Sequence, residues 1–108
     1  MVFNKQSEQG YVKMAEGILR KTTIHGDKTM MCEFRLSKGA EIPPHDHPYE
    51  QIGYMISGKM QFIIGDGSFL TQPGDSWCIP DNVPHQVEVL EDSIVVEVFS
   101  PPREDYLP

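Results

Sequence analysis

The sequence predicts an all-β domain of antiparallel strands, on the evidence of two observations. Short apolar runs alternate residue by residue with polar positions, and glycine and proline, nine of each in 108 residues, fall between these runs. A period of two places successive side chains on opposite faces of a strand. Many short strands at even spacing favour a sandwich or a closed barrel. The only helical piece expected is a single turn near residues 102–106.

Each expected strand carries an apolar stripe on one face. The stripes are Cys32, Phe34 and Leu36; Ile52, Tyr54 and Ile56; Met60, Phe62 and Ile64; Val87 and Val89; and Ile94, Val96 and Val98. Turn residues separate the strands: Ser57-Gly58 and Gly65-Asp66-Gly67 suit tight hairpins, and Pro73-Gly74 suits a type II turn. Among the aromatic residues, Tyr54, Phe62, Trp77 and Phe99 are expected in the core, with pocket walls as the alternative.

The length and composition indicate one domain spanning residues 1–108. A formal net charge of −7 argues against binding to nucleic acid or to anionic membranes, because both are negatively charged and bind basic surfaces. No apolar run approaches the ~20 residues of a membrane helix, and the first residues lack an apolar signal segment. A cytoplasmic location is therefore expected. Cys32 and Cys78 have no CxxC spacing and are expected as reduced, partly buried thiols.

Three histidines and one glutamine have the spacing of a metal site. His45 and His47 are two residues apart, so in an extended strand they point to the same face. Gln51 follows after Pro48, and His85 comes from a distant strand that barrel closure would bring near the pair. Neutral imidazole suits divalent first-row metals, so one divalent ion (Zn, Ni, Mn or Fe) is expected at these four residues. The alternatives are a solvated polar edge for the histidine pair and a surface amide for Gln51.

The residues around these ligands resemble the two motifs of the cupin superfamily. Gly39, His45, His47 and Gly58 fit the first motif, and Gly74, Pro80 and His85 fit the second. The resemblance implies a single-domain antiparallel β-barrel (a double-stranded β-helix, or jelly roll) over about residues 30–100, with the metal inside. Three positions depart from the motifs, with Gln51 for glutamate, Asn82 for glycine and Val89 for asparagine. The neutral Gln51 leaves the site about one charge more positive, which makes the ion a stronger Lewis acid. His25 lies in a turn sequence and is expected on the surface.

A narrower resemblance links the chain to small pectin-degradation cupins. It is carried by Leu19-Arg20-Lys21, Met30-Met31, the run from His45 to Gln51, and the tail from Phe99 to Tyr106. That family linearises unsaturated monouronates, so the resemblance implies a sugar-acid substrate and, if the chain is an enzyme, a metal-dependent isomerase or lyase. The same motifs also occur broadly in small cupins of unknown role.

Two residues are candidate catalytic groups for such a reaction. Arg103 offers a planar, always-charged fork for a substrate carboxylate, or alternatively a surface ion pair with Glu104 or Asp105. Glu97 is a candidate general acid/base if its strand face lines the barrel, and a plain polar residue if that face meets solvent. The pectin-degradation cupins are expected to have the shorter aspartate at the position of Glu97. This chain therefore departs from the family at a candidate catalytic residue, and the longer side chain displaces the carboxyl group by roughly one C–C bond.

Two further function classes stay open at this point. Cupins with three histidines and a fourth oxygen ligand can hold redox metals, so a quercetinase-like dioxygenase is one alternative, and a non-catalytic small-molecule barrel is the other. A homodimer is expected, because a second copy can cover the edge strands of a short barrel. The segment Val12 to Ile24 is the candidate exchanged strand.

Overall fold

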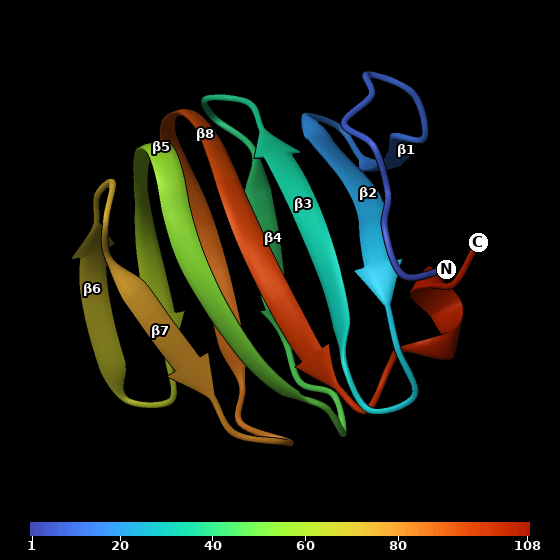
Figure 1. Ribbon diagram of the computed structural model, residues 1–108. Coiled ribbons are helices and arrows are strands. Elements are labelled where there is room, and N and C mark those ends of the chain that lie inside the picture. The colour runs from blue at the N-terminus through green and yellow to red at the C-terminus, as the bar shows by residue number, and fades with distance from the viewer.

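The computed structural model describes residues 1–108 and is built from antiparallel strands (Figure 1). The strands are β1 Val12–Ala15, β2 Ile18–His25, β3 Met30–Leu36, β4 Glu41–His45, β5 Glu50–Ile64, β6 Gly67–Thr71, β7 Ser76–Ile79 and β8 His85–Ser100. A single 3₁₀ turn, η1 Glu104–Tyr106, follows the last strand. The all-β prediction and the expected one-turn piece are both confirmed. No helix of the chain is long and apolar enough to cross a membrane.

The two longest strands, β5 and β8, pair with each other along most of their length and join two layers of the sheet. The first half of β5 pairs with β7 and its second half with β6, while β8 pairs with β4 near its start and with β3 near its end. Both long strands therefore pass from one layer to the other, which curls the sheet into a barrel (Figure 1). The register between them shifts from Met55 to Met60, where β5 bends.

Gly58 permits this bend, because its φ of +102° lies in the region that only glycine enters freely. A Cβ atom added to Gly58 would lie 2.1 Å from the hydroxyl oxygen of Ser93 and 2.5 Å from a backbone atom of β8. The first-motif glycine is thus required by the close approach of two strands.

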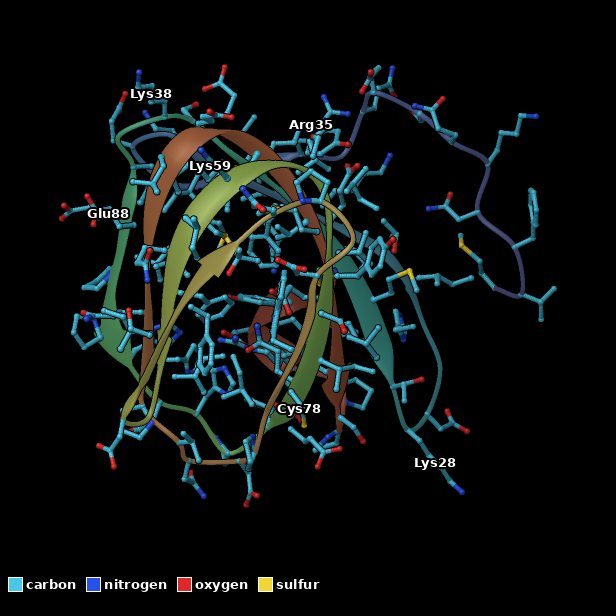
Figure 2. All side chains as sticks on the ribbon, turned by 90° about the vertical axis from the view of Figure 1, so that its left-hand side faces the viewer. Lys28, Arg35, Lys38, Lys59, Cys78 and Glu88 are labelled. Carbon is cyan, nitrogen blue, oxygen red and sulfur yellow. The ribbon has the colours of Figure 1, made fainter.

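The core lies between the two layers and is formed by alternate residues of facing strands. Cys32, Phe34 and Leu36 are buried, as are Met60, Phe62, Val87 and Val89, so these predicted stripes are confirmed. Charged side chains such as Lys38, Lys59 and Glu88 point away from the barrel (Figure 2). Phe99 is buried and Trp77 is half-buried, so both contact the interior as expected.

The predicted orientation of β5 is wrong in its first half. Ile52, Tyr54 and Ile56 are each about half exposed on the outer surface, whereas Gln51 and Met55 are buried inside. The reason is that the barrel interior near residue 51 is polar, so the apolar stripe of this strand marks its outer face. Cys78, which pairs with Ile52, is also exposed and only Cys32 is a buried thiol; both are free.

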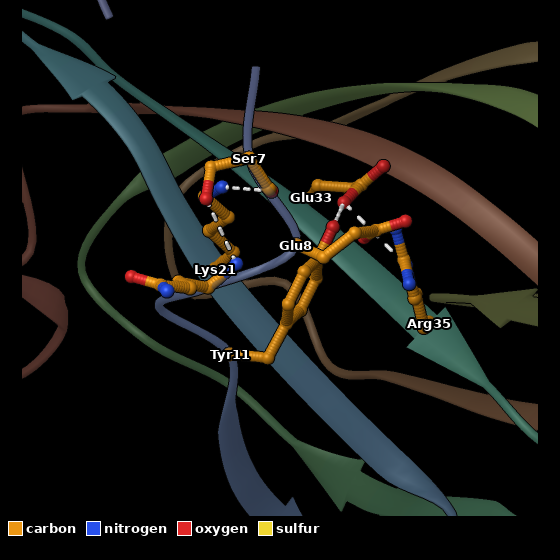
Figure 3. Close-up of polar contacts among 7 residues, drawn as sticks. Ser7, Glu8, Tyr11, Lys21, Glu33 and Arg35 are labelled. Carbon is orange, nitrogen blue, oxygen red and sulfur yellow. Dashed lines mark hydrogen bonds and ion pairs between the residues drawn. The ribbon is translucent and has the colours of Figure 1, made fainter. Parts of the chain in front are cut away.

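The N-terminal segment lies across the outer face of β2 and β3 and makes polar contacts there (Figure 3). The Tyr11 hydroxyl donates to Glu33, Arg35 pairs with Glu8 at 2.8 Å, and Lys21 donates to the Ser7 carbonyl at 2.6 Å. The segment proposed for strand exchange forms β1 and β2, and both strands pair within the chain.

Candidate metal centre

The barrel brings together the three histidines that the motifs predict. His45 ends β4, His47 lies in the connection to β5, and His85 begins β8, where it pairs in register with His45. One nitrogen of each ring lies within 4.8 Å of the others, which is close enough for all three to bind one ion. His47 and His85 are buried and His45 is exposed. His25 is exposed and has no part in the cluster.

Backbone carbonyls fix the tautomers of two of these histidines. Nδ1 of His45 lies 2.9 Å from the Pro43 carbonyl oxygen, and Nδ1 of His85 lies 2.9 Å from the Val83 carbonyl oxygen. A carbonyl oxygen only accepts, so each Nδ1 carries the proton and each Nε2 presents a lone pair. Nε2 of His85 is buried without any hydrogen-bond partner, as is Nδ1 of His47. A buried imidazole nitrogen without a partner, such as Nε2 of His85, suits a divalent transition metal.

Burial keeps the imidazoles of His47 and His85 neutral, which is the form that acts as a ligand. It lowers the pKa of His85 to about 4, with the nearby His45, His47 and Arg103 adding to the effect. Burial also lowers the pKa of His47, helped by the positive charge of Arg103. Neutral rings are the form that binds a metal.

Gln51 lies beside the triad, as its predicted role requires. Its side chain is buried, and its Oε1 lies 3.0 Å from Nε2 of His47. Two ligand atoms at ~2.1 Å from one octahedral ion are separated by about 3.0 Å. The contact therefore has the spacing of two neighbouring ligands, and in the metal-free protein it is a hydrogen bond from the His47 ring to the amide oxygen.

Glu97 faces the barrel interior and shares a cavity with His45 and His85 of the triad. The cavity has a volume of about 80 Å³ and is lined by His45, Gln51, His85, Glu97 and Arg103 among apolar side chains. Burial raises the pKa of Glu97 to about 8, although hydrogen bonds from Gln51 and Trp77 oppose the rise. The condition placed on Glu97 from sequence, that its strand face lines the barrel, is met.

Arg103 forms the ion pair that was the alternative interpretation of its role, and it also lines the cavity. It pairs with Asp105 at 2.9 Å, which lowers the pKa of that carboxyl. Its guanidinium carbon lies 3.8 Å from the centre of the Tyr106 ring. The guanidinium of the buried Arg20 lies 4.1 Å from the centre of the same ring. Tyr106, which sequence reasoning did not single out, thus holds the cation at the rim of the cavity through stacking.

Trp77 is the other residue whose role the sequence did not indicate. Its indole N–H donates to both carboxyl oxygens of Glu97, at 3.0 and 3.1 Å. Period-two alternation places Trp77 on the inner face of β7 but does not show which acid it meets, because that depends on the register of three strands.

The fold and the histidine cluster define the class of the protein, and comparison with known proteins agrees. Residues 32–100 match the family model of the cupin domain, so the chain belongs to the cupin family. This range agrees with the core expected at about residues 30–100.

Its relatives include small cupins of nearly the same length. The pectin degradation protein KdgF of Dickeya dadantii (strain 3937) is 32% identical over 102 residues, which is 93% of each chain. The structure of KdgF from Halomonas sp. is 32% identical, with a TM-score of 0.92 over 97% of this chain and 99% of that one. An RmlC-like cupin from Shewanella frigidimarina NCIMB 400 is 26% identical, with a TM-score of 0.90 over 96% of this chain and 95% of that one.

Proposed function

We propose that this cupin is a metal-dependent enzyme that opens a cyclic unsaturated uronate, or a closely related sugar acid, to its open-chain keto form. The observation that carries the proposal is that one cavity is lined by two histidines of the triad, His45 and His85, by a buried carboxyl with a raised pKa and by an arginine. The similarity to two KdgF proteins, one of them described as a pectin degradation protein, supports the choice of substrate.

His45, His47, His85 and Gln51 would hold the ion. When bound, a divalent metal supplies a Lewis acid that polarises a substrate oxygen. The donor set of three imidazoles and one neutral amide adds no negative charge, so the full charge of the ion stays available to an anionic ligand.

Arg103 would bind the substrate carboxylate. Its guanidinium carries a permanent charge and its fork matches two carboxylate oxygens. The stack on Tyr106 and the pair with Asp105 restrict its orientation. Asp105 accepts from Nε and one terminal nitrogen of the guanidinium, at 3.2 and 2.9 Å, so the N–H groups of the other edge are the ones that a substrate carboxylate would use.

Glu97 would move protons. Opening the ring requires that a proton leave the anomeric hydroxyl and that a proton reach a carbon of the double bond. A carboxyl with a pKa of about 8 exchanges protons near neutral pH in both directions, which suits a general acid/base. Glu97 lines the same cavity as His45 and His85.

Incubation with unsaturated monogalacturonate tests the proposal directly. We expect loss of the ring alkene absorbance with purified, metal-loaded protein and a loss of at least 100-fold in rate for Glu97→Gln, in the range typical of a general acid/base. Unchanged absorbance at high enzyme concentration would overturn the uronate assignment. An oxygen-uptake assay on the same samples would then test the dioxygenase alternative.

The identity of the metal requires a separate measurement. Protein purified without chelator or nickel affinity is analysed for bound metal beside a His45→Ala control. We expect about one equivalent of a divalent ion in the wild type and trace amounts in the variant. Equal trace amounts in both proteins would contradict the metal site itself.

We also propose that two copies associate through the outer surface of β5. Ile52, Tyr54 and Ile56 form an exposed apolar stripe there, and Met1, Val2 and Phe3 of the N-terminal segment are also exposed. A second copy would remove both from water. Light scattering at micromolar concentration should give twice the chain mass of 12.3 kDa, and Tyr54→Asp should reduce it to the monomer mass.

A further inference from the structure

Three residues form one row across the sheet beside the metal triad. Gly53 of β5 is in register with Trp77 of β7 on one side and with Glu97 of β8 on the other. Residues in one such row point to the same face of a sheet. The outer two side chains turn into the barrel, and the middle residue has no side chain.

The missing side chain of Gly53 is what allows Trp77 and Glu97 to meet. A Cβ atom on Gly53 would lie 2.2 Å from Nε1 of Trp77 and 2.4 Å from Oε2 of Glu97, well inside van der Waals contact. Gly53 has no positive φ that would require glycine for backbone reasons. Its place in the row is therefore explained by the space that the two side chains occupy.

Packing and hydrogen-bond chemistry also fix the Trp77 indole in its contact with Glu97. The Trp77 ring packs against Phe62 with 5.2 Å between ring centres. The indole has one N–H and no acceptor, so it can only donate to the carboxyl group. Glu97 is 5% exposed, and a buried carboxyl group that accepts from a fixed donor loses most of its freedom to rotate.

We propose that Trp77 is a positioning residue that holds the Glu97 carboxyl group toward the metal triad. Gly53 lies between the two residues and leaves the space in which their side chains meet. The proposal rests on the role of Glu97 in the proposed function. It assigns a reason to the glutamate: an aspartate would withdraw the carboxyl group from the indole by roughly one C–C bond, and shifts of that size can cost about 100-fold in rate.

Nuclear magnetic resonance tests the geometry without any turnover. The chain has one tryptophan, so a ¹⁵N-labelled sample gives a single indole N–H signal. In Glu97→Ala and Gly53→Ala we expect that signal to move upfield and its hydrogen exchange to accelerate about tenfold or more, since the hydrogen bond to the buried carboxyl group is lost. Gly26→Ala is the matched control, because a Cβ there has no neighbour within 4 Å. An indole signal unchanged by Glu97→Ala would overturn the proposal.

Kinetics of Trp77→Phe test the role. This variant keeps a flat ring against Phe62 and removes the N–H. We expect kcat on unsaturated monogalacturonate to fall by about 10- to 100-fold with KM unchanged, partial rescue in Trp77→His, and no further loss when Trp77→Phe is combined with Glu97→Gln. An unchanged kcat in Trp77→Phe would overturn the role. If the wild type shows no turnover while the indole signal responds as expected, the uronate reaction fails and the contact between the two residues stands.

Discussion

The two ends of the barrel interior differ in character although the same two strands build both. At one end, β5 and β8 turn Gln51, His85 and Glu97 inward. At the other end, the inward residues of the same strands are apolar, with Met55, Val89 and Val95 almost fully buried. The polar end holds the candidate metal centre, and the apolar end supplies the packing.

This difference shows how a small barrel separates stability from chemistry. Burying polar groups costs free energy unless each one finds a partner. The apolar end supplies the hydrophobic burial that offsets this cost. At the polar end, backbone carbonyls accept from Nδ1 of His45 and of His85, and Gln51 and Trp77 donate to Glu97. Substitutions at the two ends should therefore affect different properties.

The largest expected effect on stability comes from the apolar end. Met55→Ala should lower the free energy of unfolding by about 3 kcal/mol, because it leaves a cavity at a fully buried position. Metal content per folded chain should stay the same, since Met55 does not line the site. Urea unfolding together with metal analysis measures both properties. A loss of metal in folded Met55→Ala would mean that the two ends are coupled.

The next effect comes from the metal. Addition of the native divalent ion to a hundred times its Kd should stabilise the wild type by about 2.7 kcal/mol, which raises Tm by roughly 10–20 °C in a domain of this size. His85→Ala should lose this gain, because it removes the buried nitrogen that has no other partner. His25→Ala, at an exposed position outside the cluster, should retain it. Scanning calorimetry with and without chelator makes the comparison, and equal gains in wild type and His85→Ala would contradict the triad.

The sequence predicted the strands and the histidine cluster better than which faces of β5 and β8 turn inward: Met55 and Val95 are buried, whereas the predicted stripes that contain Ile52 and Ile94 lie on the outer faces. Alternation located the strands, and motif spacing placed His45, His47 and His85 together before any coordinates. Ile52 and Tyr54 lie on the outer face of β5, against expectation. An apolar stripe normally faces the interior, but the barrel interior beside this part of β5 is polar. Contacts across several strands, such as that of Trp77 with Glu97, depend on register, which short alternating runs do not specify.

Glu97 should give the polar end an unusual response to alkali. Its pKa is raised from 4.5 to about 8 on folding, so its stabilising contribution is complete below pH 4.5 and is lost as the pH rises toward 8. Glu97→Gln removes this cost and still accepts from Trp77. We expect the variant to gain on the order of 2 kcal/mol over the metal-free wild type between pH 5 and pH 8. Chelator-treated samples unfolded in urea at the two pH values measure the gain, and parallel stability curves would show that Glu97 ionises normally.

The smallest expected effect is the acid response of His85. Its pKa falls from 6.5 to about 4 on folding, so its contribution is present above pH 6.5 and is lost as the pH falls toward 4. This slope opposes that of Glu97, so the two partly cancel in the wild type. In metal-free Glu97→Gln the cancellation is removed, and we expect stability to fall by about 1–2 kcal/mol from pH 7 to pH 5. Adding His85→Asn to that variant should flatten the slope, because asparagine does not titrate. If the slope of the double variant stays as steep, the acid sensitivity does not arise from His85, and His47, whose pKa burial also lowers, is the next group to replace.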